Sequence, residues 1–309
     1  MLAVLTIALP VFGLILAGWG AGRAGLLGRD ATGALNLFVV WLALPAVLFR
    51  AMALIHPADL LNGGLLASFG LGIIIPYSGY VWWSGRRGTP LGHGAIQGLS
   101  ATFANVGYMG IPLCLMAFGE GSLVPGVITM VITACPQFGA AIVLLELDQP
   151  GPRDFGRVFR RVGGALIRNP LLMSTVAGLF VALAGLPLPV PVDRFLVLMG
   201  GAATPCALVA TGLMLGETTE RFQPLLVARL VAIKLIVQPA IVWLIAFHVM
   251  TLPPAWGETA VLMSALPTGA GAFIIAKLYG KEAASTSGAV LVSTILSFAT
   301  LSVLLTWLT

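Results

Sequence analysis

The stretch ANVGYMGIPL, residues 104–113, decides the fold, because it places two glycines and a proline inside an otherwise apolar segment. Gly107 suits the left-handed C-cap of one helix, and Pro112 suits the first turn of the next, where no amide donor is needed. Asn105 can satisfy backbone groups that such a break frees, or it can bind a solute. We therefore expect a broken helix here, whose second half begins near Gly110 to Leu113.

A second stretch of this kind, LPTGAGAF at residues 266–273, also carries one proline and two glycines. We expect its second half-helix to begin near Gly271 to Phe273. Two such helix starts present free amides and positive dipole ends, which favour an anion. The alternative is a pair of ordinary kinks that allow close helix packing. Unwound backbone at bilayer depth, however, is tolerated only where protein or a watery cavity surrounds it.

The segments around these breaks belong to a membrane protein. Of 309 residues, 16 are Lys or Arg and 11 are Asp or Glu, so 9% are charged, whereas a soluble domain carries about 25%. The hydrophobic fraction is 59% and the mean hydropathy is +1.03. A soluble fold could not hide that much apolar surface. The composition also excludes disordered, fibrous and nucleic-acid-binding proteins.

Charge and Gly/Pro clusters divide the chain into ten apolar segments of spanning length. Their limits are 2–22, 31–53, 60–84, 93–118, 122–147, 170–190, 194–216, 223–248, 256–279 and 285–308. The fold class is therefore an all-α integral membrane bundle. The basic segment 148–169 between spans five and six is either a solvated loop or a short amphipathic helix at the lipid surface.

The basic residues predict the orientation in the membrane. Loops after odd-numbered spans carry 12 of the 16 Lys and Arg residues, whereas loops after even-numbered spans carry only Arg50 and Arg194. Positive loops face the cytoplasm, so the expected protein is a multi-pass inner (plasma) membrane protein. Its N- and C-termini face outside, and loop 148–169 is cytoplasmic.

The two halves of the chain resemble each other at an offset of about 160 residues. Matching positions include Pro10 with Pro170, Pro45 with Pro205, Pro76 with Pro239, Gly119 with Gly280, and Gly126 with Gly288. Each half contains five spans, an odd number, so the second copy is inverted. We predict a first repeat at 1–147, the cytoplasmic loop at 148–169 and a second, inverted repeat at 170–309. Inverted repeats are the usual architecture of secondary transporters.

The polar residues within the spans complete a candidate pocket. Lys234 is the one ionisable side chain near a span centre, and Gln238 follows one turn later. The lysine either attracts a carboxylate or snorkels to the interface. Thr129, Thr133 and Gln137 form a stripe that either lines a cavity or bonds neighbouring helices. All 11 acidic residues lie in loops or at span ends.

The remaining reactive residues suggest no catalytic or metal site. Cys114, Cys135 and Cys206 lie in apolar runs without CxxC spacing and are interpreted as buried thiols. No histidine is expected to pair with a carboxylate, and His56, His93 and His248 are expected in interface or solvated positions. We therefore predict no enzyme, no cofactor and no metal.

The motif NVGYMGIP, residues 105–112, resembles the N-x-G-[FY]-M-G-x-P signature of the auxin efflux carrier family, whose bacterial members include organic-acid permeases. The stretch from Pro267 to Gly280 resembles the ninth span of that family, and the resemblance covers the whole chain. It implies a fold like that of bile acid:sodium symporters, with broken crossover helices in spans four and nine. Spans 1, 2, 6 and 7 would form a scaffold that often dimerises, so a homodimer through these helices is expected. Spans 3–5 and 8–10 would move as an elevator.

In the family, Asn105, Pro112 and Pro267 would border the substrate. Many relatives carry a small polar residue at the position of Gly271. Sodium-coupled relatives place an acid near the second crossover, and this chain has none there, so sodium coupling is not expected.

The resulting hypothesis is a secondary active transporter of organic anions, such as malate, malonate or auxin-like acids. The alternative is a passive anion channel or a membrane sensor that uses the same pocket. The candidate substrate-binding residues are Asn105, Gly107, Tyr108, Gly110, Pro112, Thr133, Gln137, Lys234, Gln238, Pro267, Thr268, Gly269 and Gly271. The expected partners are a small organic anion and the lipid bilayer, with no nucleic acid.

Overall fold

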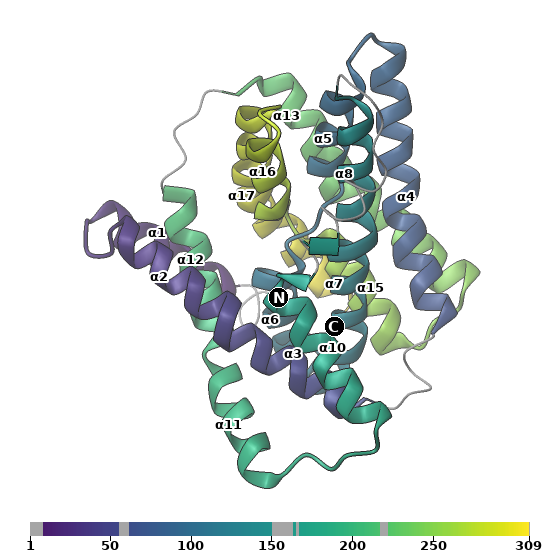
Figure 1. The fold of residues 1–309 in the computed structure, drawn as a ribbon. Coiled ribbons are helices and arrows are strands. Elements are labelled where there is room, and N and C mark those ends of the chain that lie inside the picture. The colour runs from purple at the N-terminus through teal and green to yellow at the C-terminus, as the bar shows by residue number, and fades with distance from the viewer. Residues whose placement is uncertain (1–8, 56–61, 150–162, 165–166, 217–221, 309) are drawn as a thin grey trace.

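The computed structural model describes residues 9–55, 62–149, 163–164, 167–216 and 222–308, which form helices and their connections (Figure 1). In chain order the α-helices are α1 (Leu9–Arg23), α2 (Arg29–Phe38), α3 (Leu44–Ala53), α4 (Gly63–Arg86), α5 (Leu91–Ser100), α6 (Ile111–Phe118), α7 (Leu123–Ile132), α8 (Phe138–Leu147), α10 (Pro170–Leu183), α11 (Val190–Gly201), α12 (Ala203–Gly216), α13 (Pro224–Ala232), α14 (Gln238–Trp243), α15 (Pro254–Ala265), α16 (Ala270–Leu278) and α17 (Ala283–Leu308). Most of the predicted amphipathic helix at 148–169 lies outside the described residues.

Within the described residues, six helical stretches are long and apolar enough to cross a membrane, which makes the chain a multi-pass membrane protein. They are Asp30–Ala53, Gly63–Arg86, Glu120–Leu147, Val190–Leu215, Pro224–Val249 and Ala283–Leu308. The apolar helices Val106–Phe118 and Pro170–Leu183 are shorter. Predicted spans four and nine each consist of two helices with a break between them, as expected.

Wide turns interrupt several long helices, and prolines account for most of them. The π-helical turns η2 (Val39–Ala43), η4 (Val106–Gly110) and η7 (Ile233–Val237) each precede a proline in the first turn of the following α-helix. A fourth, η6 (Thr133–Gln137), contains Pro136. Proline lacks an amide donor and its ring clashes with the carbonyl four residues earlier, so the preceding turn widens. A fifth wide turn, η8 (Leu244–Val249), has no proline within it.

Two helix pairs pack at backbone contact. Gly18 of α1 lies against the carbonyl of Val209 in α12, and Gly178 of α10 lies against the carbonyl of Phe49 in α3. The two contacts are equivalent in the two halves of the chain, because Gly178 lies 160 residues after Gly18 and Val209 lies 160 residues after Phe49. A side chain at either glycine would collide with backbone atoms, so glycine is what allows these helices to approach. We call α1, α2, α3, α10, α11 and α12 the first helix group.

The remaining helices, α4 to α8 and α13 to α17, form a second group around the two breaks. In Figure 1 most of the second group lies above and to the right of the first. The largest cluster of buried hydrophobic side chains joins both groups and includes Phe69 of α4, Met109 of η4 and Met263 of α15. The two breaks are therefore inside the molecule rather than at a loop.

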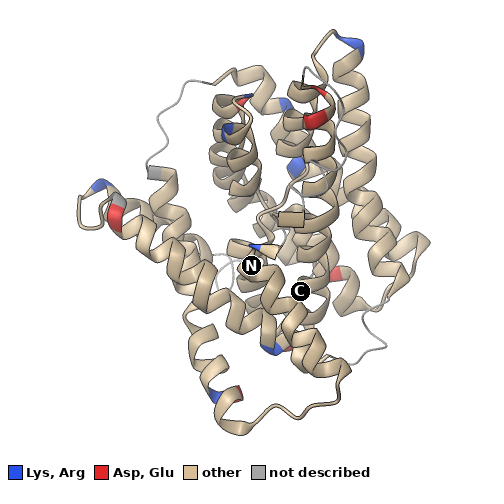
Figure 2. Cartoon of the chain, in the orientation of Figure 1, with Lys and Arg blue, Asp and Glu red and all other residues tan. Residues whose placement is uncertain are grey.

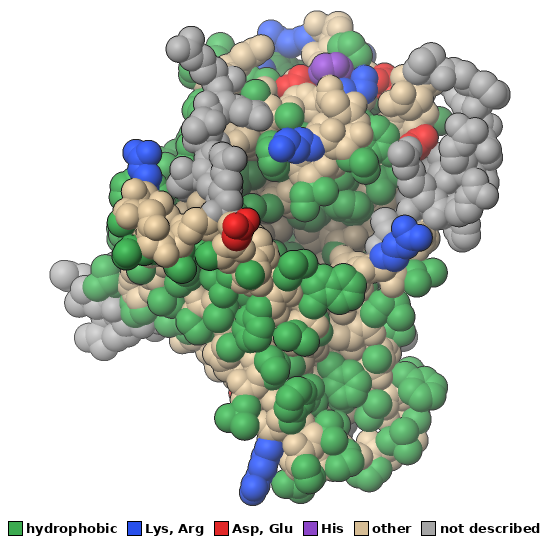
Figure 3. Space-filling view, turned by 60° about the vertical axis from the view of Figure 1, so that its left-hand side comes forward, with side chains coloured by type: hydrophobic (Ala, Val, Ile, Leu, Met, Phe, Trp, Pro, Cys, Tyr) green, Lys and Arg blue, Asp and Glu red, His purple; other side chains and the backbone are tan. Residues whose placement is uncertain are grey.

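Charged side chains gather mostly at the two ends of the molecule (Figures 2 and 3), and hydrophobic ones cover the surface between them. At one end the Arg50 Nε donates to Asp193 Oδ1 at 2.6 Å. This pair neutralises one of the two basic residues that the sequence assigns to the outside.

At the other end the structure corrects an expectation: a histidine does pair with a carboxylate. His93 Nδ1 lies 2.9 Å from Glu282 Oε1, and Lys281 Nζ lies 3.1 Å from Asp148 Oδ2. Burial alone would raise the pKa of Asp148, but the hydrogen bonds from Lys281 and from the Gly92 amide prevail and lower it. His93 and Glu282 are 189 residues apart, which is why adjacent sequence gave no sign of the pair.

Replacement of Gly18 by Ala tests the backbone contact between α1 and α12. The added methyl group would meet the Val209 carbonyl, and overpacking of this kind costs about 1–3 kcal/mol. We expect a lower thermal unfolding midpoint in detergent for Gly18→Ala. The matched control is Gly13→Ala in the same helix, where a methyl group has nothing within 4 Å and no loss is expected. Equal midpoints for the two variants would contradict the assignment.

Candidate functional site

The two breaks cross and hydrogen-bond to each other. Ala104 and Thr268 form an antiparallel β-bridge. The Asn105 amide donates to the Pro267 carbonyl at 2.9 Å, and the Gly269 amide donates to the Phe103 carbonyl at 2.8 Å. Each unwound segment thus supplies the backbone partner that the other lacks. We call residues 101–108 and 266–271 the crossing.

The half-helices begin earlier than predicted. Helix α5 ends at Ser100, and the new helix starts at Val106 with the wide turn η4, so Gly107 is not a C-cap and Gly110 is not the start. Pro112 does lie in the first turn of α6, but α6 continues η4 without a break. The second half-helix begins at Ala270 rather than between Gly271 and Phe273. In both cases the start lies next to the bridge, because pairing with the other segment ends there.

Four backbone amides at these starts have no acceptor among the described residues: Gly107, Tyr108, Ala270 and Gly271. All four residues are half-buried, whereas Ala104, Pro267 and Thr268 beside them are buried. Asn105 is also half-buried, and no hydrogen bond of its side chain is found within the described part of the chain. These groups can therefore reach a solute.

The accessible side of the crossing faces the first helix group. Tyr108 packs with a cluster formed by Val39, Leu44 and Ala207 of that group. Gly107 lies nearest to Leu171 and Leu44. The Cδ1 atoms of these leucines are 3.8 and 4.0 Å from the position that a Cβ on Gly107 would occupy. The candidate site is thus at the boundary between the two helix groups.

Side chains of the other break and of neighbouring helices bond to the backbone and side chains of each break. Thr268 Oγ1 donates to the Ser100 carbonyl at 2.8 Å, and the Thr268 amide donates to Ser293 Oγ at 2.9 Å. Gln238 Nε2 donates to the Thr102 carbonyl at 3.1 Å, and Gln137 Nε2 donates to Thr102 Oγ1 at 2.9 Å. Thr102 itself donates to a carbonyl of α5, so its hydroxyl can accept from Gln137.

Lys234 is fully buried in η7, and its ammonium donates to the Ser264 carbonyl at 2.6 Å. Ser264 lies in the last turn of α15, where carbonyls have no partner within the helix and the dipole end is negative. The ammonium therefore caps this helix end. The alternative of a snorkelling side chain is wrong, because no part of Lys234 reaches the surface.

Several predicted site residues are buried and contact neighbouring parts of the protein, so they are not accessible to a solute. Pro112, Thr133 and Gln137 are buried, and Thr133 donates to the Thr129 carbonyl within its own helix. Gly110 lies against Met263 of α15, and a Cβ at Gly269 would lie 3.0 Å from the Ala104 carbonyl. Of the stripe on span five, Gln137 thus bonds the crossing, at Thr102.

Three residues that hold the crossing were not among the predicted site residues: Ser100, Thr102 and Ser293. Ser100 ends α5 and Thr102 lies in the break two residues later, where hydroxyl side chains commonly bond to free backbone groups. That position was the available signal. Ser293 lies in the middle of α17 and carries no local signal of its role.

The arrangement suits a small anion. It combines two helix starts that have free amides with a neutral amide side chain at Asn105. Neither 60–119 nor 259–281, the stretches that contain the two breaks, includes any Asp or Glu. Within the described part of the chain, no group of three His, Cys, Asp or Glu side chains could hold a metal ion. The site therefore offers positive polarity without catalytic groups.

Comparison with known proteins identifies the class to which this fold and site belong. The family described as "Membrane transport protein" matches residues 3–305. A protein of Rhizobium meliloti (strain 1021) named "Putative malonate transporter" is 29% identical over 97% of this chain and 94% of its own. An "Uncharacterized transporter" of Methanothermobacter thermautotrophicus is 24% identical over 95% of this chain and 94% of its own. The "Uncharacterized transporter YfdV" of Escherichia coli (strain K12) is 24% identical over 88% and 87%.

The protein is therefore a membrane transporter and not an enzyme. The chain belongs to the membrane transport protein family, the auxin efflux carrier family that residues 105–112 resemble.

Replacement of Thr268 by Val tests how the crossing is held. Valine keeps the shape but removes the donor to the Ser100 carbonyl, and a buried unpaired polar group costs about 1–3 kcal/mol. We expect a lower thermal unfolding midpoint for Thr268→Val. The control is Thr306→Val in α17, whose hydroxyl makes an exposed bond within its own helix. If the unfolding midpoint falls equally in the control, the bond from Thr268 to Ser100 does not stabilise the protein more than an exposed hydroxyl bond does.

Proposed function

We propose that this transporter carries small organic anions, mono- or dicarboxylates such as malonate or malate, or auxin-like acids, by secondary active transport. The observation that carries the proposal is the pair of half-helix starts at the crossing, with free amides at Gly107, Tyr108, Ala270 and Gly271. A carboxylate accepts hydrogen bonds from such amides and is favoured by their dipoles. Asn105 adds a side-chain amide at the same place.

The charge distribution supports an anionic cargo. Lys234 places an ammonium behind the crossing, on the carboxyl end of α15. Its proposed contribution to anion binding is a charge that acts at a distance, since its nitrogen is buried. The name of the Rhizobium meliloti relative, at 29% identity, favours a dicarboxylate within this class.

The proposed topology has ten spans in two inverted repeats, 1–147 and 170–309, joined by loop 148–169. Its support is that equivalent positions behave alike. Gly25 and Gly185, 160 residues apart, have φ of 72° and 62°, and Gly119 and Gly280 have φ of 71° and 63°. The paired contacts of Gly18 and Gly178 follow the same offset.

The proposed mechanism is an elevator in which the second helix group moves past the first. The support is that the two breaks are bonded into one unit by their own backbones and by side chains of α14 and α17. Beside Tyr108 the boundary with the first group is formed by apolar contacts, and among the described residues an ion pair of 3.7 Å between Arg50 of α3 and Glu120 also crosses this boundary. We also propose that the protein is a homodimer through the first helix group and lies in the inner membrane. Its termini face outward in this proposal, and transport is not coupled to sodium.

The most informative measurement is uptake of radiolabelled malonate into proteoliposomes, with and without malonate inside and with an imposed proton or sodium gradient. We expect accelerated exchange when malonate is present on both sides, because a carrier returns faster when loaded. Conductance without such counterflow would indicate an anion channel. No uptake but saturable binding would indicate a sensor, and no response to any carboxylate would end the anion hypothesis.

Replacement of Asn105 by Asp tests the polarity of the site. The new carboxylate would occupy the positive end of the crossing and repel a carboxylate solute, so we expect malonate uptake to fall at least tenfold. Asn105→Ala, which removes the amide without adding charge, is expected to reduce uptake less. The matched control is Asn62→Asp, which adds the same charge but keeps the N-cap of α4, since Asp caps as well as Asn. If uptake by Asn105→Asp equals that of Asn62→Asp at equal expression, the solute does not bind at Asn105.

A further inference from the structure

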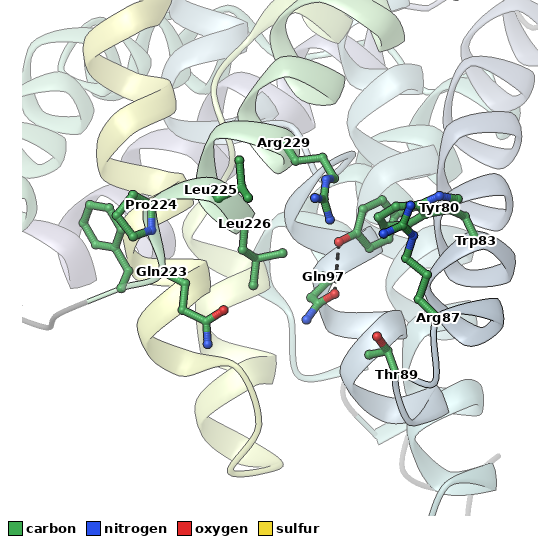
Figure 4. Close-up of a pocket in the computed structure, with 11 residues that line it drawn as sticks. Tyr80, Trp83, Arg87, Thr89, Gln97, Gln223, Pro224, Leu225, Leu226 and Arg229 are labelled. Carbon is green, nitrogen blue, oxygen red and sulfur yellow. Dashed lines mark hydrogen bonds between the residues drawn. The ribbon is translucent and has the colours of Figure 1, made fainter.

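A pocket of about 500 Å³ lies between the end of α4, helix α5 and the start of α13 (Figure 4). All three elements belong to the second helix group, whereas the candidate substrate site faces the first. The pocket is at the end of the molecule that the arginine distribution predicts to be cytoplasmic. It is therefore separate from the boundary at which a solute would meet the crossing.

Two arginines converge on one indole ring in this pocket. The guanidinium carbon of Arg87 lies 4.7 Å from the centroid of the Trp83 ring, and that of Arg229 lies 4.6 Å from it. Figure 4 shows both guanidinium groups pointing towards Trp83 and Tyr80. Among the residues that the structure describes, neither arginine has an acidic side chain within ion-pair distance. Two neighbouring cations that share a ring and have no acidic partner among the described residues favour an added anion.

The acid bonded to the pocket lining is already engaged. Tyr80 Oη donates to Gln97 Oε1 at 3.0 Å, Gln97 Nε2 donates to Glu282 Oε1 at 3.0 Å, and His93 contacts the same oxygen. Glu282 is therefore held by Gln97 and His93 rather than by the two arginines.

The walls of the pocket are apolar and reach the outer surface. Pro224, Leu225 and Leu226 line one side, and the Leu225 side chain is 76% exposed. The first turn of α13 also has no side-chain cap, so its amides add donors beside the guanidinium groups. A ligand that fits both features has an anionic head and an apolar portion that continues into the bilayer.

We propose that the pocket formed by Arg87, Arg229 and Trp83 binds the phosphate headgroup of an anionic phospholipid. Arginine pairs hold phosphate oxygens with bidentate hydrogen bonds, and a tryptophan at headgroup depth is typical of the membrane interface. Basic pockets between helices on the cytoplasmic side are known lipid headgroup sites. The phosphate of a bound lipid would reduce the repulsion between the two guanidinium groups and hold α4 against α13.

The test uses the full chain in nanodiscs of phosphatidylcholine alone and of phosphatidylcholine with phosphatidylglycerol. Retained lipid is counted by native mass spectrometry. We expect the wild type to retain phosphatidylglycerol and the double variant Arg87→Gln/Arg229→Gln to retain at least tenfold less. The matched control is Arg86→Gln, because Arg86 lies 4.6 Å from the Trp82 ring in the same way but outside the pocket. This control is expected to keep the lipid.

A second measurement needs no variant. Dihexanoyl phosphatidylglycerol should raise the thermal unfolding midpoint of the wild type in neutral detergent, and dihexanoyl phosphatidylcholine should not. Equal retention by the double variant and the wild type would overturn the proposal, as would an equal loss in Arg86→Gln, which indicates surface charge alone. If inorganic phosphate stabilises as well as the anionic lipid at equal concentration, the pocket takes a free anion instead. Malonate uptake is not part of this readout, so the lipid site and the proposed transport function can fail separately.

Discussion

The structure depends on one constraint: non-helical backbone inside an apolar bundle must find hydrogen-bond partners. An unpaired buried amide or carbonyl costs about 1–3 kcal/mol, and a broken helix creates several at once. Here the two breaks pair with each other through Asn105 with Pro267 and Gly269 with Phe103. Neither break could exist at this depth alone, because each is the other's partner. This requirement ties together segments that lie about 160 residues apart.

The backbone carbonyls on one side of each break find hydrogen-bond donors, whereas several amides on the other side find no acceptor. This difference gives the site its polarity. The carbonyls that end α5 and α15 receive donors from Thr268, Gln238 and Lys234. The amides of Gly107, Tyr108, Ala270 and Gly271 receive no acceptor within the described residues, and these residues are half-buried. The negative helix ends are thus buried and satisfied, while the positive ends are open. A site whose free backbone groups are donors selects for a solute that supplies acceptors.

The sequence was sufficient to locate both breaks and to place Lys234 near the centre of a span, because these features follow from local composition. It left open whether the lysine side chain stays in the interior or snorkels, and the structure shows it fully buried. The sequence was not sufficient for the helix limits. Gly107 and Pro112 have the local preferences of a C-cap and a first turn, yet α5 ends at Ser100 because Thr268 and the β-bridge compete for its last backbone groups. The hydrogen-bond partner of Lys234 could not be predicted either, because composition carries no sign of a backbone carbonyl 30 residues away. Local patterns predict where a helix fails, and distant partners decide on which residue.

The close glycine contacts divide the molecule along the same boundary as the proposed movement. In the described chain, the contacts of Gly18, Gly178 and Gly212 with backbone carbonyls join helices of the first group to each other. Those of Gly110, Gly269 and Gly271 with Met263, Ala104 and Phe103 lie wholly within the second group. Gly107 is the glycine of the crossing that faces the other group, and there the nearest side-chain atoms are at ordinary van der Waals distance. Tight packing transmits displacement, whereas loose apolar contact lets surfaces slide. The proposed elevator would slide along this boundary beside Asn105, so the proposed solute site would lie where the motion occurs.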